Sequence, residues 1–324
     1  MSELSVVVPV YGCAACLSAL HERLCAALGE ITDDFEIVYV DDRSPDGAWD
    51  VLRELAAGQD CATKVVRLSR NFGQSIAITA GIAEAVGEWI VLIDCDLQDD
   101  PADIAALYRE ARAGHEIVFS RRSNRDEGWF RRVAARAYFR VRNRLLDLDM
   151  DTEHGSLMLF SRRVAGAYLQ VQDRDRHHAL ILHWLGFDPA YVDVRRGPRY
   201  QGRSAYTLRT LLASAFDGLF FQTSVLLRWI VYSGFAVVAL GILLAAALVT
   251  LSFAAHPPPG WTSLAVLILV IGGFIILSSG VGALYIGKIF NQVKARPLYV
   301  IDETLDAATA DRVPARARLD DSGG

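Results

Sequence analysis

Two aspartates separated by one residue are the side chains in this chain best placed to do chemistry. Residues 89–93 are β-branched or large and apolar, which is typical of a buried strand, and Asp94 and Asp96 follow directly. Unpaired carboxylates are too costly to bury, so we expect both at the mouth of the strand, where residues i and i+2 point the same way. Such a pair suits a hard divalent cation that also binds the phosphates of a substrate.

Helix capping offers a structural explanation for part of this acidic stretch. Pro101 opens a helical pattern, so Asp99 or Asp100 would serve as its N-cap or lie in its first turn. Capping does not explain Asp94 and Asp96, and for that pair we predict a metal–phosphate site.

The first 120 residues alternate between strand and helix patterns. This alternation predicts a parallel sheet with right-handed crossovers and a ligand crevice at the carboxyl ends of its strands. No G-x-G-x-x-G follows the first strand and the chain has no G-x-x-x-x-G-K-[ST], which argues against a dinucleotide-binding fold and a P-loop. The predicted strands are 4–10, 35–40, 64–68, 89–93 and 117–119, and the predicted helices are 16–29, 48–58, 74–86 and 104–113.

The C-terminal third of the 324 residues has a very different composition. Residues 229–287 contain no Asp, Glu, Lys or Arg, and a proline-rich segment at 256–260 divides them into two apolar runs. Each run exceeds the roughly 20 residues that a membrane helix needs. Basic residues flank the outer ends of the runs and none lies in the connection, so we expect both ends, with the N-terminal part, on the cytoplasmic side.

The five cysteines fit a reducing compartment. Cys13 and Cys16 form a lone C-x-x-C without a second Cys/His pair, which is a weak zinc signal. We expect ordinary, partly buried thiols, with redox chemistry as the alternative. His177, His178 and His183 could suggest a metal site, but adjacent histidines cannot share one helix face, which favours capping and surface ion pairs.

Four motifs, in order, resemble glycosyltransferase family 2. They are V-V-V-P-V-Y at 6–11, V-D-D-R-S at 40–44, L-S-R-N-F-G at 68–73 and D-C-D-L-Q-D at 94–99. More narrowly, the chain resembles the polyprenyl-phosphate glycosyltransferases, such as dolichol-phosphate mannose synthases and bactoprenol glucosyl transferases. The resemblance spans about residues 4–210 and extends to the two apolar runs.

The resemblance implies the fold of the N-terminal part and a set of ligands, and the composition of the chain predicts the segments that follow. Residues 1–206 would form an α/β nucleotide-sugar-binding domain of the GT-A fold with a mainly parallel sheet. Amphipathic interface helices at 207–228, a two-helix transmembrane hairpin at 229–287 and a cytoplasmic tail at 288–324, disordered after Asp302, would follow. A nucleotide sugar would be the donor and Mg²⁺ or Mn²⁺ the cofactor.

The resemblance also assigns roles by position. Asp96 would be the main metal ligand with Gln98 beside it, and Asp94 would complete the D-x-D motif and meet the donor. Arg121 matches a position that meets the phosphates. The nucleotide-sugar pocket would comprise Pro9, Tyr11, Asp41, Asp42, Ser44, Asn71, Gly73, Asp94 and Arg121.

Two later segments depart from the family pattern. Ser156 and Met158 replace the acid and the base of a G-D-F-R-L element, which leaves Glu153 and His154 as the adjacent polar candidates for catalysis. Ala205 stands where a Lys or Thr is usual in an R-x-x-G-x-S-K-Y element. A phosphate acceptor is already an anion near neutral pH, with a second pKa of about 6, so it needs little help from a base. We expect contacts to an acceptor phosphate from Arg131, Arg176, Arg199, Arg203 and Ser204.

Two segments have the pattern of an amphipathic helix, and the apolar side of each helix can be explained in two ways. The basic segment 125–144 and the segment 207–227 either lie on a membrane surface or pack their apolar sides against the protein. No recognised nucleic-acid-binding module accompanies the basic segment, so nucleic acid is not an expected partner.

Together with the apolar runs, the resemblance implies a membrane-anchored, metal-dependent, inverting glycosyltransferase, with a homo-oligomer as an open alternative to a monomer. It would move a sugar from a nucleotide-diphosphate sugar to polyprenyl (undecaprenyl) phosphate at the cytoplasmic face of the inner membrane, in cell-envelope polysaccharide synthesis. One alternative is extension of a lipid-linked or cell-surface oligosaccharide at a sugar hydroxyl. Another is a non-catalytic, membrane-bound scaffold that only binds nucleotide.

Overall fold

The computed structural model describes most of the N-terminal two thirds of the chain and its last long helix. The described residues are 2–58, 61–122, 154–174, 176–194 and 260–306, with isolated positions between 230 and 243. The chain divides into two compact units. Unit 1 comprises 1–143, 148–204 and 297–324, and unit 2 comprises 144–147 and 205–296.

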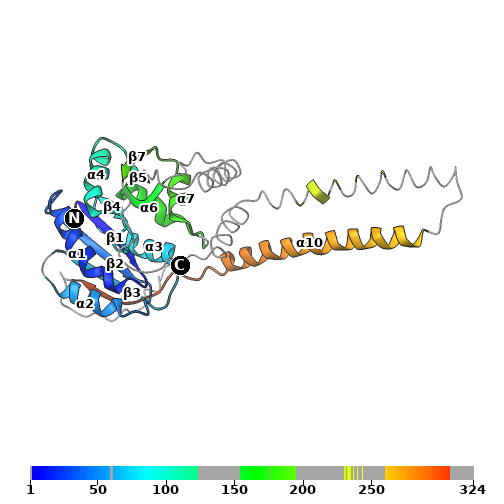
Figure 1. Cartoon of the computed structure of the whole chain (residues 1–324), viewed down its shortest axis with the longest axis horizontal. Coiled ribbons are helices and arrows are strands. Elements are labelled where there is room, and N and C mark those ends of the chain that lie inside the picture. Colours follow the sequence, from blue (N-terminus) through cyan, green and yellow to red (C-terminus); the bar gives the residue numbers. More distant parts are fainter. Residues whose placement is uncertain are drawn as a thin grey trace, which may run out of the picture. The chain divides into compact units, whose positions relative to one another are not determined.

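The described part of unit 1 is built on one sheet whose strand order is β7-β5-β6-β4-β1-β2-β3-β8 (Figure 1). Strands β4, β1, β2 and β3 are mutually parallel, whereas β6 and β8 run antiparallel to their neighbours. The predicted α/β architecture with a mainly parallel central sheet is therefore confirmed. The strands are β1 (Leu4–Val10), β2 (Phe35–Asp41), β3 (Thr63–Leu68), β4 (Trp89–Leu92), β5 (Ile117–Arg122), β6 (His154–Ser161), β7 (Pro189–Val194) and β8 (Ile301–Asp306).

Helices cover both faces of this sheet. Leu4, Val6 and Val8 of β1 pack in the cluster that includes α1, α2 and α4, whereas Val7 packs in the cluster that includes α3, α6 and α7. Side chains alternate between the two faces of a strand, so β1 needs apolar residues at nearly every position. The helices are α1 (Ala14–Gly29), α2 (Ala48–Ala57), α3 (Gln74–Glu84), α4 (Ile104–Arg112), α6 (Arg162–Gln170) and α7 (His178–Trp184), with a 3₁₀ turn η1 (Pro101–Asp103) before α4.

The order of the strands reverses beside β1. The chain runs from β1 to β2 and β3 on one side, and then returns to place β4 on the other side of β1. In an open α/β sheet, such a reversal leaves a crevice at the carboxyl ends of the two strands concerned. The residues after β1 and β4 are therefore brought together.

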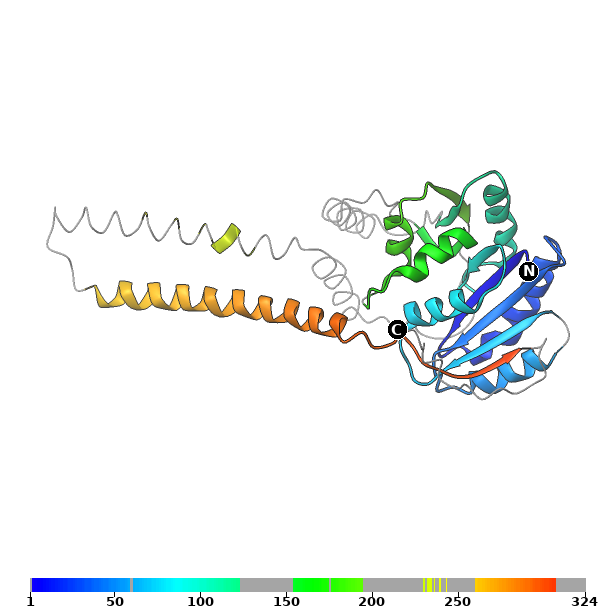
Figure 2. The same ribbon diagram turned by 180° about the vertical axis from the view of Figure 1, so that it is seen from behind.

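The C-terminal segment contributes an edge strand that the sequence did not predict. We expected disorder after Asp302, but β8 pairs antiparallel with β3 (Figure 2). Arg43 forms an ion pair with Asp302 at 2.6 Å. The prediction was wrong for residues up to Asp306 because an edge strand can be polar and still form ladder hydrogen bonds. Residues 307–324 lie outside the described part.

Unit 2 is described mainly through α10 (Trp261–Val293), which includes the predicted second apolar run. Several of its side chains lie outside the described part, and among the described residues no helix is both long enough and apolar enough to cross a membrane. The predicted interface segment at 207–228 and most of the first apolar run lie outside the described residues.

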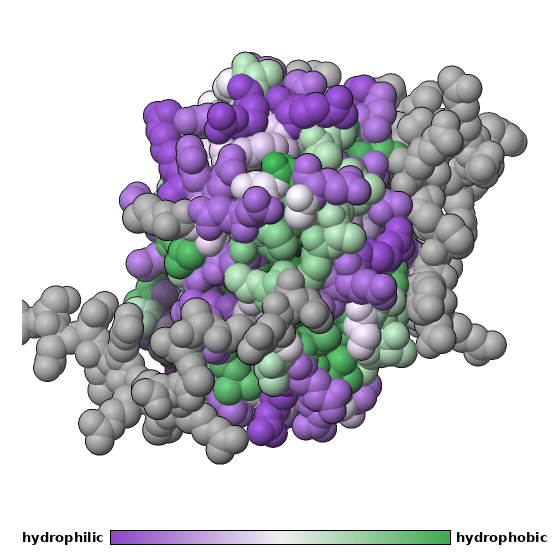
Figure 3. Space-filling model, turned by 90° about the vertical axis from the view of Figure 1, so that its left-hand side faces the viewer, coloured by the Kyte–Doolittle hydropathy of each residue, from purple (hydrophilic) through white to green (hydrophobic). Residues whose placement is uncertain are grey.

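The face of unit 1 shown in Figure 3 is mostly hydrophilic, with a smaller group of apolar residues near its centre. This surface is typical of a domain whose apolar side chains are used between the layers. Tyr11 is one of several exposed large side chains among the described residues, since this residue is 54% exposed directly after β1. That position lies at the crevice.

Candidate active site at the carboxyl ends of β1, β2 and β4

The D-x-D motif lies where the sequence predicts, directly after β4, and both aspartates are partly exposed. Asp94 Oδ1 accepts a hydrogen bond of 2.7 Å from Gln74 Nε2, at the start of α3. Asp96 Oδ1 accepts one of 3.2 Å from the backbone N–H of Gln98. Leu97 has a φ of 57°, a left-handed conformation that is uncommon for leucine and that turns the chain back toward Asp96.

Gln98 provides a test of whether these residues fit a divalent cation. Its side-chain oxygen Oε1 is buried and has no hydrogen-bond partner among the described residues. Leaving such an oxygen unpaired is costly, and an amide oxygen beside a carboxylate is a donor set that Mg²⁺ and Mn²⁺ accept. The residues therefore fit the expected metal, which Asp96 and Gln98 would hold.

Ser44 and Asp46 join the loop after β1 to the loop after β2. The N–H of Gly12, whose φ of +69° favours glycine, donates to Ser44 Oγ at 2.7 Å, and Ser44 Oγ donates to Asp46 Oδ1 at 2.6 Å. The N–H of Ala14 donates to Asp46 Oδ2 at 2.8 Å. Burial acts to raise the pKa of Asp46, but these hydrogen bonds outweigh it and lower the pKa. Ser44 thus fixes the loop that presents Tyr11.

Asp41 and Asp42 are buried beneath these loops. Asp41 Oδ1 accepts from the N–H of Ser44 at 2.8 Å, and Asp41 Oδ2 lies 3.4 Å from Arg67 Nε. Burial is the largest influence on both carboxyl groups and raises the pKa of each, despite the hydrogen bonds that oppose it. Their place in the nucleotide-sugar pocket stays a prediction. In this structure they hold the surrounding loops.

The two carboxylate oxygens of Asp42 secure the loop before α3. They accept from the backbone N–H of Phe72 at 2.7 Å and of Gly73 at 2.8 Å. Gly73 has a φ of +97°, a conformation that side chains oppose. The loop also carries Asn71, which is exposed, and leads directly into Gln74, the partner of Asp94. A buried carboxylate thus positions one side of the D-x-D motif.

Sequence reasoning missed a contact between Asp99 and Ser156. Ser156 Oγ on β6 donates a hydrogen bond to Asp99 Oδ2, and Asp99 is 3% exposed. The cap of η1 is Asp100, which accepts from the N–H of Ala102 at 3.1 Å. An acid from the D-x-D loop therefore lies beside the strand position where the family pattern has an acid. The departure at Ser156 was the available signal, but it does not indicate which residue fills the space.

Three other predicted residues have clear placements. Pro9 is buried within β1, paired with Val40. Arg121 Nε donates to Asp193 Oδ1 at 2.7 Å, and this hydrogen bond lowers the pKa of Asp193. Arg176 is 7% exposed, and its guanidinium donates to the carbonyls of Tyr168 and Val171 at the end of α6. Because Nε of this guanidinium has no hydrogen-bond partner among the described residues, the contact of Arg176 with an acceptor phosphate stays a prediction.

The remaining candidates fall largely outside the described part. His154 is described only through its backbone in β6, where it is opposite Arg121. His183 packs its ring on Phe119 at a centroid distance of 4.5 Å. Glu153, Arg131, Arg199, Arg203 and Ser204 lie outside the described residues.

The cysteines are the second clear correction to the sequence analysis. Cys13 and Cys95 form a disulfide that links the loop after β1 to the centre of the D-x-D motif, and Cys25 pairs with Cys61. Cys16 is the free thiol and is buried. The expectation of ordinary thiols was wrong for these four cysteines, because the fold brings together residues that are 82 and 36 positions apart in the sequence.

Comparisons with known proteins find relatives along almost the whole chain. The model of the family described as glycosyl transferase family 2 matches residues 5–169. An uncharacterized glycosyltransferase of Synechocystis sp. is 34% identical over 309 residues, which cover 93% of this chain and 95% of the relative. An undecaprenyl-phosphate 4-deoxy-4-formamido-L-arabinose transferase of Pectobacterium carotovorum is 33% identical, and the match covers 95% of each protein.

A solved structure also shares the fold. A mannosyltransferase from Pyrobaculum calidifontis, in complex with GDP-Man and Mn²⁺, superimposes with a TM-score of 0.51 at 20% identity. The match covers 91% of this chain and 88% of that protein. It supports the assignment of the fold.

Proposed function

Because this chain belongs to glycosyl transferase family 2, we propose that it moves a sugar from a nucleotide-diphosphate sugar to a polyprenyl phosphate. The proposed acceptor rests on the similarity, over 95% of both chains, to an enzyme named for undecaprenyl phosphate. The D-x-D motif beside Gln98, at the crevice of the sheet, supports the proposal that the donor is a nucleotide sugar.

On the donor side, the chain supplies a platform for the nucleotide and a set of oxygen ligands for the metal. The exposed ring of Tyr11 presents an apolar face at the carboxyl end of β1, which suits stacking on a base. Asp94 is held by Gln74, and Asp96 and Gln98 would hold Mg²⁺ or Mn²⁺. When bound, such a cation neutralises charge on the departing diphosphate.

On the acceptor side, the site has less need of a base. A phosphate monoester is a dianion above about pH 6, so in-line placement against the sugar is the main requirement. Ser156 cannot serve as an acid or a strong base, and its hydroxyl is engaged with Asp99. We propose single displacement with inversion at the anomeric carbon, in which the acceptor oxygen attacks as the diphosphate leaves.

An assay with two matched acceptors tests this function. A panel of nucleotide sugars with Mn²⁺ should yield a lipid-linked sugar with undecaprenyl phosphate and none with undecaprenol. The rate should rise through about pH 6 and then level off, because it follows the ionisation of the acceptor. Ser156→Ala should cost less than about tenfold in kcat.

The alternatives predict different results in the same assay. A thousandfold loss of kcat in Ser156→Ala with donor binding preserved would show that a protein group at this position is required, and would favour transfer to a sugar hydroxyl. Donor binding without transfer or hydrolysis under any of these conditions would favour the nucleotide-binding scaffold.

We also propose that the two apolar runs anchor the enzyme in the cytoplasmic membrane with the catalytic unit in the cytoplasm. The support comes from the sequence, which has no charged residue between 229 and 287 and basic residues at both outer ends. A cysteine introduced at Pro258 should react with an impermeant maleimide in intact cells. One introduced at Ser322 should react only after lysis, and labelling of both from the same side would refute this topology.

A further inference from the structure

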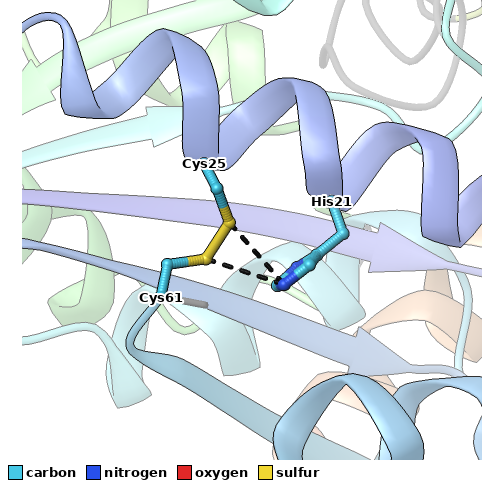
Figure 4. A group of neighbouring side chains, drawn as sticks. All are labelled: His21, Cys25 and Cys61. Carbon is cyan, nitrogen blue, oxygen red and sulfur yellow. Dashed lines mark hydrogen bonds between the residues drawn. A yellow bond between two sulfur atoms is a disulfide. The ribbon is translucent and has the colours of Figure 1, made fainter. Parts of the chain in front are cut away.

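A cluster of two cysteines and one histidine lies outside the candidate active site, between α1 and the segment before β3. His21 and Cys25 are one turn apart on α1, so they share a face of that helix. Cys61 precedes β3, at the amino end of the parallel strands, whereas the candidate active site lies at their carboxyl ends. Figure 4 shows both sulfur atoms directed at the imidazole ring of His21. No step of the proposed transfer uses these residues.

Nε2 of His21 lies equally far from the two sulfur atoms. Nε2 is 3.6 Å from Cys25 Sγ and 3.6 Å from Cys61 Sγ. His21 is 5% exposed, and its other nitrogen, Nδ1, lies 3.2 Å from the hydroxyl of the buried Tyr39. The imidazole is thus fixed on one side by Tyr39 and directs its second nitrogen at both cysteines.

This spacing matches that of ligands around a tetrahedral metal ion. With a Zn–S distance of about 2.3 Å and a Zn–N distance of about 2.0 Å, a histidine nitrogen and a cysteine sulfur lie about 3.5 Å apart. The two sulfurs, which are bonded to each other in this structure, would have to move to about 3.8 Å apart. The Cα–Cα distance of 6.1 Å leaves room for that change by side-chain rotation.

We propose that His21, Cys25 and Cys61 form a binding site for a thiophilic divalent cation such as Zn²⁺ when the Cys25–Cys61 disulfide is reduced. Two thiolates and one neutral imidazole are a ligand set that zinc prefers, with water in the fourth position. The site has two exclusive states, a disulfide and a metal dithiolate. The proposed cytoplasmic location favours the second, because disulfides are rare in a reducing compartment.

A thiol reductant of the glutathione class can convert the disulfide state into the reduced state that binds the metal. Two such thiols reduce the Cys25–Cys61 bond and leave as their own disulfide, and each cysteine sulfur takes up one proton. Binding of Zn²⁺ then releases both of those protons, because the metal binds thiolates. Nε2 of His21 would bind the metal while Nδ1–H donates to Tyr39, which sets the tautomer and the orientation of the ring.

The binding test uses Co²⁺, whose bonds to thiolates give a charge-transfer absorption that bonds to oxygen do not. The full chain in detergent would carry Cys13→Ser and Cys95→Ser, because those cysteines adjoin the D-x-D carboxylates. After reduction by excess small thiol and its anaerobic removal, we expect a thiolate band that saturates at about one Co²⁺ per chain and that Zn²⁺ abolishes. The oxidised protein should show no band.

Further substitutions separate this site from other thiols. Cys25→Ser or Cys61→Ser should remove the band, whereas Cys16→Ser, which alters the other buried thiol of α1, should retain it. Tyr39→Phe should weaken Zn²⁺ binding by about tenfold, because it removes the group that orients His21. That effect distinguishes ligation through His21 from adventitious binding to two thiols.

Two outcomes would contradict the proposed metal site. One is a reduced, folded protein, as judged by circular dichroism, that shows no thiolate band with Co²⁺. The other is a band of equal strength in Cys25→Ser or Cys61→Ser. If reduction unfolds the protein, Zn²⁺ should restore its ellipticity, because a metal ion that binds only the folded state favours folding. Failure of Zn²⁺ to do so would also contradict the proposed metal site.

Discussion

Replacing Asp96 with asparagine is expected to lower sugar transfer by about a thousandfold while leaving the fold intact. The substitution keeps an oxygen that can accept the N–H of Gln98, so the local turn is retained. It removes the negative charge that a divalent cation needs at this position. The measurement is kcat with a nucleotide sugar and undecaprenyl phosphate, at saturating Mn²⁺, together with the Tm of the purified protein.

Asp100→Asn is the matched control for this prediction. Asp100 lies in the same acidic stretch, but its side chain is half exposed, caps η1 and pairs with Arg23 at 3.1 Å. Asparagine is an equally good N-cap, so this variant should keep nearly full activity. Comparable losses in both variants, or full wild-type activity in the presence of EDTA, would contradict a metal role for Asp96.

Replacing Asp42 with alanine is expected to lower the free energy of unfolding by about 2 kcal/mol and to raise the KM for the donor by about tenfold. Asp42 is 2% exposed, and its removal leaves the N–H groups of Phe72 and Gly73 without their acceptor. The loop that they belong to leads into Gln74, which holds Asp94, so loosening it also disturbs the D-x-D motif. Urea unfolding and initial-rate kinetics measure the two effects.

The stability difference should also depend on pH. Burial raises the pKa of Asp42 in the folded protein above its usual value of 3.8. The folded state therefore binds a proton on Asp42 more tightly than the unfolded state does. The contribution of this proton to the free energy of unfolding is complete below pH 3.8 and declines as the pH rises through the raised pKa. The difference in free energy of unfolding between wild type and Asp42→Ala should become smaller over that pH range.

An exposed aspartate offers the control for Asp42. Asp50 lies in the first turn of α2 and is exposed, so Asp50→Ala should change stability by less than about 0.5 kcal/mol and leave the KM unchanged. If Asp42→Ala resembles Asp50→Ala in stability and KM, then Asp42 does not position the loop before α3.

The elements that have strong periodic patterns could be predicted closely. The apolar runs at 4–10 and 64–68 became β1 and β3 almost residue for residue, and the helical spacing at 16–29 became most of α1. The acidic pair after β4 could also be placed, because a buried strand cannot hold unpaired carboxylates in its interior. By contrast, β8 is polar and forms by pairing with β3, so its sequence carries no periodic apolar signal.

Pairings between distant residues could not be predicted in the same way. Asp99 and Ser156 are 57 positions apart and meet because β6 lies beside β4. Cys13 and Cys95 meet because β4 lies beside β1, although the sequence offered Cys16 as the nearer partner for Cys13. Cysteine connectivity cannot be deduced from spacing alone.

The sequence by itself determined the alternation of strands and helices, the acidic strand end and the charge-free C-terminal stretch. Each of these follows from the burial preferences of residues that are neighbours in the chain. The tertiary structure decided which residues meet: Asp42 with the loop before α3, Asp99 with Ser156, and His21 with Cys25 and Cys61. These contacts depend on the order of strands in the sheet, which is set by the packing of all the elements together.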